Sequence, residues 1–290
     1  MLDGLPLSRN ARIGSIRIHA IEAGVVQLDG GAMFGVVPKT LWERRIPPDA
    51  RNRIPLALRC LLIEAPNALV LVDTGIGNKE DEKFAEIYGL MNVGTPTRLE
   101  DGIREAGFDP ADIDIVLNTH LHFDHAGGNT LRDLEGRIVP SFPGARHVVQ
   151  RGELDFSRSG NERIRASYLS HNVEPVSEEG LWDVVDGPAR ITEGVRVVPT
   201  PGHTPYHQSV LIESEGRTAC FLADVCPTSA HLPLPWVMGY DLEPLVTLES
   251  KRSLWAQALD EDWLLVFEHD PRTPWGHLDP AADRIALREP

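Results

Sequence analysis

The chain has 290 residues, of which 42% are hydrophobic and 24% charged, as in an ordinary globular protein. Its 43 acidic and 28 basic residues give a formal net charge of -15, which disfavours nucleic acid and anionic membrane surfaces as partners. The three cysteines form no CxxC pair, and the start of the chain has no basic flank followed by an apolar run. We therefore expect a single domain over residues 1–290, located in the cytoplasm, with free thiols.

The first unusual stretch is "LDGGAMFGVVPKTLW", residues 28–42, which is apolar and rich in glycine. It contains Met33, Phe34 and Trp42, and its spacing predicts no helix. Composition alone fits either a core strand with a turn or a segment that faces a ligand.

Short β-rich runs then alternate with helical patterns, which is typical of α/β layers. The run "ALVLVDTG", residues 68–75, predicts a buried strand that stops at Asp73. An amphipathic helix is expected over residues 99–106, closed by Gly107. The run "IDIVLNTH", residues 113–120, predicts a strand that leads directly into the motif "THLHFDHAGG".

The second half of the chain repeats this pattern. A predicted strand, "VRVVPTPGH", ends at His203, and the predicted hairpin "SVLIESEGRTACFLADV" ends at Asp224. A proline-rich irregular region, residues 227–240, precedes a helical pattern over residues 245–254. The run "WLLVFEHD" is a last buried strand that ends at His269. The sequence therefore predicts two comparable αβ halves.

The motif after residue 118 predicts a metal site. In an extended segment side chains alternate, so His120 and His122 point the same way, and a turn into a helix can aim Asp124 and His125 toward them. The small residues 126–128 allow a close approach of the backbone and the metal. Imidazole and carboxylate are ligands of zinc and similar ions. A solvated histidine-rich loop is the alternative, but neutral imidazoles crowded beside a carboxylate seldom serve packing alone.

Other strand ends add candidate ligands. With His203, Asp224 and His269 the set reaches seven residues, too many for one tetrahedral ion. His207 lies four residues after His203 and is expected to support a ligand rather than to bind metal itself.

These motifs carry a family resemblance. The series "VDTG", "THLHFDHAGG", "PGHTPYHQS", "FLADV" and "VFEHD" resembles that of the metallo-β-lactamase fold hydrolases, over residues 69–269. The resemblance implies a four-layer αββα sandwich of the α/β class, with the metals at one edge. It implies that one ion is held by His120, His122 and His203 and the other by Asp124, His125 and His269. Asp224 would bridge the two ions, and Asp73 would support the ligands from behind.

Such a centre predicts hydrolysis. Two divalent ions with a bridging hydroxide and two ligating aspartates keep a positive excess, which suits them to polarise a carbonyl or phosphoryl oxygen. Zinc lowers the pKa of bound water from about 15.7 to about 7, so a hydroxide nucleophile exists at neutral pH. We expect two zinc ions, with manganese, cobalt and iron as alternatives.

The resemblance also bears on the substrate. Residues 28–42 are similar to the N-terminal stretch of quorum-quenching lactonases within the family, which implies a substrate loop at about residues 28–55. In that loop Met33, Phe34 and Trp42 would line an apolar channel for an acyl chain. The expected reaction is the opening of lactone rings, above all those of N-acyl homoserine lactones. The resemblance further implies a homodimer.

The sequence departs from the family pattern at the position expected for the proton donor. Lactonases of this class carry a tyrosine three residues after the bridging aspartate, where this chain has Pro227. His231 is the substitute candidate, because an imidazole can donate near neutral pH; its alternative is an exposed loop histidine. The residues expected to take part in catalysis are Asp124, Asp224 and His231.

Other functions remain as alternatives. A phosphotriesterase or arylesterase similar to methyl parathion hydrolases is the main one, since the same hydroxide can attack phosphorus. A β-lactamase is disfavoured because those relatives usually have cysteine or serine in place of Asp224, and a nuclease is disfavoured by the acidic charge. A non-catalytic metal- or lipid-binding protein is disfavoured by the complete set of ligands.

Overall fold

The computed structural model describes residues 7–91, 96–281 and 285–288. The first six residues, on which the expected absence of a leader partly rests, lie outside this range. Within it, every helix is too short or too polar to cross a membrane.

The first half of the chain forms a sheet with seven described strands, in the order β1-β2-β3-β4-β5-β8-β9. The strands are β1 (Ser8–Ile13), β2 (Ile16–Asp29), β3 (Arg53–Ala65), β4 (Ala68–Val72), β5 (Ile115–Leu117), β8 (Arg146–Gln150) and β9 (Trp182–Val185). The pairs from β1 to β4 are antiparallel, and those from β4 to β9 are parallel. The strands predicted within residues 68–75 and 113–120 are confirmed as β4 and β5.

The second half forms another sheet with seven described strands, in chain order from β10 to β16. They are β10 (Ala189–Thr192), β11 (Val195–Pro199), β12 (Gln208–Ser214), β13 (Arg217–Phe221), β14 (Leu264–Val266), β15 (Trp275–Leu278) and β16 (Leu287–Arg288). A separate hairpin joins β6 (Thr130–Arg132) to β7 (Ile138–Pro140). Strands β13 and β14 are parallel. The predicted hairpin is confirmed as β12 and β13, and it turns at Glu215 and Gly216 with φ of 52° and 72°.

The helices are α1 (Gly30–Phe34), α2 (Lys39–Trp42), α3 (Glu82–Tyr88), α4 (Arg98–Glu105), α5 (Phe123–Ala126), α6 (Arg151–Ser157), α7 (Glu174–Glu178) and α8 (Pro244–Asp260). The helices expected over residues 99–106 and 245–254 are confirmed as α4 and α8. The absence of helix expected in residues 28–42 is wrong, because α1 and α2 lie there. Helices this short show no periodicity. The start of α1 is instead capped by Asp29, whose carboxylate accepts a hydrogen bond from the amide of Ala32.

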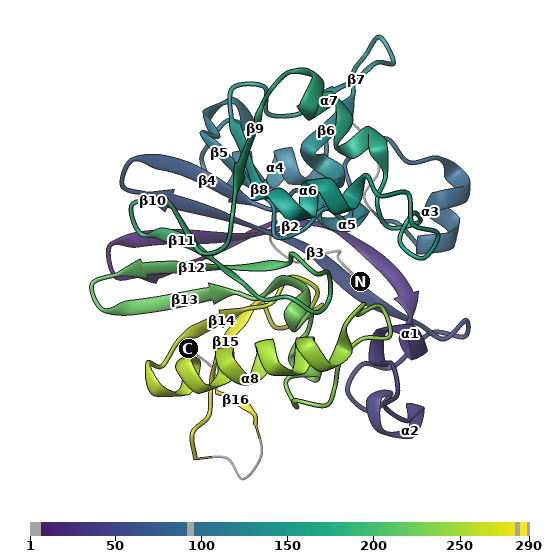
Figure 1. Cartoon of the computed structure of the whole chain (residues 1–290), viewed down its shortest axis with the longest axis vertical. Coiled ribbons are helices and arrows are strands. Elements are labelled where there is room, and N and C mark those ends of the chain that lie inside the picture. Colours follow the sequence, from purple (N-terminus) through teal and green to yellow (C-terminus); the bar gives the residue numbers. More distant parts are fainter. Residues whose placement is uncertain (1–6, 92–95, 282–284, 289–290) are drawn as a thin grey trace.

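The two sheets stack face to face between outer helices, as Figure 1 shows, with α8 along the second sheet and α4, α6 and α7 beyond the first. One apolar cluster joins the inner faces of the sheets and includes Leu61, Val70, Val210 and Phe221. Another joins the second sheet to α8 through Trp255 and its neighbours. The central strands are buried on both faces, which explains their continuous apolar runs. The expected αββα sandwich is confirmed.

Candidate metal centre

The polar residues that follow the central strands meet at one edge of the sandwich. His120 and His122 follow β5, and α5 comes directly after them with Asp124 and His125. From the second sheet, His203 follows β11, Asp224 lies in the 3-10 helix η4 (Ala223–Val225), and His269 follows β14. The carboxyl ends of parallel strands meet at the same sheet edge, and β4–β5 and β13–β14 are such pairs.

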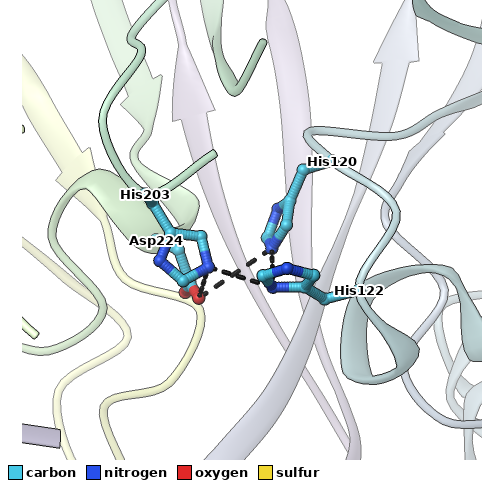
Figure 2. A group of neighbouring side chains, drawn as sticks. All are labelled: His120, His122, His203 and Asp224. Carbon is cyan, nitrogen blue, oxygen red and sulfur yellow. Dashed lines mark hydrogen bonds and ion pairs between the residues drawn. The ribbon is translucent and has the colours of Figure 1, made fainter. Parts of the chain in front are cut away.

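A first group consists of His120, His122, His203 and Asp224, which Figure 2 shows pointing toward one another. Nδ1 of His122 lies 3.1 Å from Nε2 of His120 and 3.0 Å from Nε2 of His203. The Asp224 carboxylate is 3.1 Å from Nε2 of His203 and 4.0 Å from Nε2 of His120. Three imidazoles from two sheets thus aim their nitrogens at one point.

A second group consists of Asp124, His125 and His269. The Nε2 atoms of His125 and His269 are 3.1 Å apart, and the Asp124 carboxylate is 3.8 to 3.9 Å from both. Asp224 reaches this group as well, at 3.1 Å from Nε2 of His269 and 3.6 Å from Nε2 of His125. Its carboxylate therefore lies between the two groups.

The chemistry of this donor set fits divalent cations. Ring nitrogens that face one another cannot all donate protons, and the side chains concerned are buried. Burial and the neighbouring imidazoles hold the pKa of His120 and His122 well below its usual range, which keeps the rings in the neutral form that binds metal. Oδ1 of Asp224 is buried, and apart from its 3.1 Å approach to Nε2 of His269 it has no hydrogen-bond partner among the described residues. A metal ion in each group would satisfy these atoms.

Two carboxylates support His125 from behind. Its Nδ1 lies 3.1 Å from Oδ2 of Asp73 and 3.0 Å from Oε2 of Glu268. Asp73 is itself held, because its carboxylate accepts hydrogen bonds from the amide and the hydroxyl of Thr119, at 2.8 and 2.6 Å. Asp73 thus lies where a supporting residue is expected. Such partners fix the ring orientation of a ligating histidine.

Glu268 is not among the site residues predicted from the sequence. It is fully buried, and this burial raises the pKa of its carboxyl to about 8 although His125 opposes the shift. The available signal was a glutamate directly before His269, at the end of an otherwise apolar strand. Glutamates are almost never fully buried unless they are paired.

Asp241 was also missed, and it supports the first group. Its Oδ1 lies 3.0 Å from Nδ1 of His203. The predicted support from His207 takes another form, because its Nε2 accepts a hydrogen bond from the backbone amide of Asp224 at 3.2 Å. Burial lowers the pKa of His207 to about 3, so the ring is a neutral acceptor.

The glycines of the motif serve backbone packing. A Cβ atom on Gly127 would lie 2.6 Å from Cα of Ile76, and one on Gly128 would lie 2.2 Å from the carbonyl oxygen of Thr74. They let the turn after β4 approach the end of α5. Asp73, in that turn, has a φ of 53°, which a residue with a side chain seldom adopts.

A cavity of about 420 Å³ opens onto both groups. Its apolar walls include Leu28, Met33, Leu56, Phe123, Ile164 and Met238. Its polar residues apart from the two groups are Tyr88, Arg163, Ser167 and Tyr240. Met33 thus lines the cavity as expected. Phe34 and Trp42 do not, because both are buried behind it, with their rings stacked 5.2 Å apart.

His231 is not positioned to donate a proton to a ligand in the cavity. It is buried, and its Nδ1 and Nε2 lie 2.8 Å from the hydroxyl of Thr228 and 2.9 Å from the carbonyl oxygen of Met33. Its ring stacks on Phe34, and burial lowers its pKa to about 4. We therefore correct the expectation: His231 holds α1 against the chain that follows Asp224.

Comparisons with known proteins agree with this geometry. The sequence matches the family model of the metallo-beta-lactamase superfamily over residues 54–269. An N-acyl homoserine lactonase from Bacillus cereus is 29% identical over 229 residues, which cover 76% of this chain and 83% of that protein. The N-acyl homoserine lactonase AttM from Rhizobium radiobacter is 28% identical over 194 residues, covering 64% of this chain and 68% of that protein.

Solved structures show the same fold. A probable metal-dependent hydrolase from Staphylococcus aureus has a TM-score of 0.87 and 32% identity, with 97% of this chain and 99% of that chain covered. AidC, a dizinc quorum-quenching lactonase in complex with a product, has a TM-score of 0.77 and 19% identity, with 99% of each chain covered.

Proposed function

Since this chain belongs to the metallo-β-lactamase superfamily of hydrolases, we propose that it holds two metal ions and opens lactone rings, most of all those of N-acyl homoserine lactones. The observation that carries the proposal is the carboxylate of Asp224 between two ligand groups, at the base of a cavity with mostly apolar walls. Relatives named N-acyl homoserine lactonase, at about 29% identity, support the choice of substrate.

The ligands divide as the two groups do. His120, His122 and His203 would hold one ion, Asp124, His125 and His269 the other, and Asp224 both. When bound, the ions would polarise a carbonyl oxygen and lower the pKa of water to about 7, which supplies hydroxide at neutral pH. Because these ligands are buried, they have little contact with water, and their charges act in a medium of low dielectric constant. The identity of the metal is proposed as zinc, on the chemistry of the ligands.

The cavity suits a substrate with one polar and one apolar end. The ester group would lie at Asp124 and Asp224, and an acyl chain would pack on Met33, Leu56 and Met238. In this proposal Met33 is the substrate contact that residues 28–42 supply. Both sheets contribute to one centre, which supports treating residues 1–290 as one domain.

Two tyrosines can take the role expected of His231. Tyr88 and Tyr240 line the cavity. Burial raises the pKa of Tyr88, and so does the carboxylate of Asp124. Burial and the neighbouring Tyr88 raise the pKa of Tyr240 to about 12. Their hydroxyls therefore stay protonated at neutral pH and can donate a hydrogen bond to the leaving oxygen.

The competing function is hydrolysis of phosphotriesters or aryl esters by the same centre. Steady-state kinetics on a series of N-acyl homoserine lactones and on paraoxon-type esters separates the two. We expect the higher kcat/KM for a lactone. A kcat/KM for lactones far below that for the phosphotriester would contradict the proposal. The variant Asp186→Ala, which changes an exposed carboxylate paired with Arg151, serves as a control with unchanged activity.

A further inference from the structure

Lys251 of α8 is a lysine with no exposed surface. Its ammonium group donates to backbone carbonyl oxygens of one irregular segment: His231 at 2.6 Å, Trp236 at 2.9 Å, Pro233 at 3.0 Å and Leu234 at 3.5 Å. Carbonyl oxygens accept hydrogen bonds and never donate them, so a cage of four such oxygens suits a cationic donor at its centre. The ammonium group of Lys251 fills this place.

The segment concerned forms one wall of the cavity, and we call residues 228–242 the pocket loop. Its later part supplies Met238, Gly239, Tyr240 and Leu242 to the cavity lining. It also carries Asp241, which supports the ring of His203.

The opposite side of the pocket loop contacts α1. The amide of Gly239 donates to the carbonyl oxygen of Ala32 at 2.8 Å, and the ring of His231 lies 2.9 Å from the carbonyl oxygen of Met33. The pocket loop is therefore held on one side by hydrogen bonds to α1 and on the other by hydrogen bonds from Lys251. A change at Lys251 reaches the substrate cavity through the loop, because the lysine itself does not line the cavity.

The carbonyl cage makes the loop depend on charge rather than on packing alone. Several carbonyl dipoles that converge in a buried place repel one another unless a cation neutralises them, and burying them unpaired is costly. Trp255 offers a comparison one helical turn along α8, because its indole donates to the carbonyl oxygen of Leu232 at 3.0 Å without any charge. Of these two residues, only Lys251 brings a charge to the loop.

We propose that Lys251 is a positioning residue whose ammonium acts as a built-in monovalent cation, and that the carbonyl cage around it is a binding site for a small alkylammonium ion once the side chain is removed. The proposal rests on the proposed function only for the choice of substrate.

The test replaces Lys251 with alanine, which removes the atoms from Cγ to Nζ, the skeleton of n-propylammonium. With the lactone or ester that the wild type hydrolyses best, we expect KM to rise roughly tenfold and kcat to change much less. A variant that is merely unstable would lose folded molecules, which lowers the apparent kcat and leaves KM unchanged. Adding n-propylammonium chloride, with the uncatalysed rate subtracted, should return KM most of the way to the wild-type value.

Three controls separate charge from volume. 1-Propanol has the same length without the charge and should not restore KM. Lys251→Met keeps most of the stem, so its KM should rise and should not respond to the amine. Trp255→Phe removes the neutral hydrogen bond to the same loop and should not respond either.

A wild-type KM in Lys251→Ala, or equal rescue by 1-propanol, would overturn the proposal. If Lys251→Ala does not fold, Lys251→Met takes its place in the test. An unchanged KM in Lys251→Met would then overturn the proposal. If the wild type hydrolyses neither lactones nor phosphotriesters, the proposed function fails separately. The role of Lys251 is then decided by whether n-propylammonium raises the thermal midpoint of Lys251→Ala but not that of the wild type.

Discussion

The two ligand groups of the centre are supported in different ways. In the second group, His125 is braced by the buried carboxylates of Asp73 and Glu268, which follow strands of the two different sheets. In the first group, His203 is supported by Asp241. That residue belongs to the pocket loop rather than to a sheet. The second group is thus supported by residues at the strand ends of both sheets, while the first is linked to the wall of the cavity.

This difference suggests separate duties for the two groups. Residues that support a ligand tune its orientation and basicity, and their loss typically costs 10- to 100-fold in metal affinity or activity. A substitution at Asp73 or Glu268 should therefore weaken the binding of the ion at the second group, with little effect on substrate affinity. A substitution at Asp241 in the pocket loop should weaken both the binding of the ion at the first group and the binding of substrate.

The largest effect is expected from a substitution of Asp224, whose carboxylate lies between the two groups. Asp224→Ala removes the carboxylate that lies within 3.1 Å of both His203 and His269, so both groups lose a ligand. We expect kcat/KM to fall roughly a thousandfold and at least one ion to be lost. Hydrolysis at the wild-type rate with full metal content would contradict the bridging role. Asp186→Ala is the matched control, since it removes an exposed carboxylate.

The next prediction concerns the two supports. Glu268→Gln should lower the affinity for one ion by roughly 10- to 100-fold and leave KM nearly unchanged, while Asp241→Asn should weaken the other ion and also raise KM. Metal titration of each apoprotein, followed by kinetics at saturating metal, measures both quantities. If the two variants weaken the same ion, or if Glu268→Gln raises KM as much as Asp241→Asn does, the two groups are not supported separately.

A smaller effect is expected in the cavity wall. Met33→Ala should remove apolar contact with an acyl chain and raise KM for long-chain lactones by roughly tenfold, with little change for short chains. Met91→Ala, at a methionine that is 48% exposed and does not line the cavity, is the control. A uniform change across all chain lengths would argue against a chain-binding role for Met33.

The smallest effect on catalysis is expected at His231. His231→Gln should cost about 1–3 kcal/mol of stability at pH 7 and leave kcat unchanged. The pKa of His231 is about 4 in the fold against an ordinary value of 6.5, so between these values the unfolded chain binds the proton and the folded chain does not. This contribution to the free energy of unfolding is therefore present above pH 6.5 and is lost as the pH falls toward 4.

Denaturant unfolding at several pH values checks this prediction. The wild type should lose stability between pH 6.5 and 4 more steeply than His231→Gln. A large fall in kcat in the variant would instead restore His231 as a proton donor.

The meeting of the polar residues at one edge could be predicted from the sequence. Each of Asp73, His120 and His269 comes shortly after a strand whose apolar run is long enough to recognise, and parallel strands bring such ends together. That these residues hold two ions stays a prediction. Glu268 escaped notice because it continues an apolar strand and its importance depends on His125, which is far away in the chain.

The walls of the cavity could not be predicted in the same way. His231 was misassigned because its partners are the carbonyl oxygen of Met33, 198 residues away, and the ring of Phe34. Met33 and Phe34 are neighbours in α1, yet only Met33 reaches the cavity. A helix of five residues leaves no periodic signal from which to infer which side faces a ligand. Distant packing, rather than local pattern, decides these positions.

The central claim is a dinuclear hydrolytic centre, and the metal content of the active protein tests it most directly. Elemental analysis of purified enzyme, with lactone hydrolysis measured on the same sample, should give close to two divalent ions per chain. Activity should disappear on chelation and return as both ions are restored. Full lactone hydrolysis at a ratio close to one ion per chain would contradict the account.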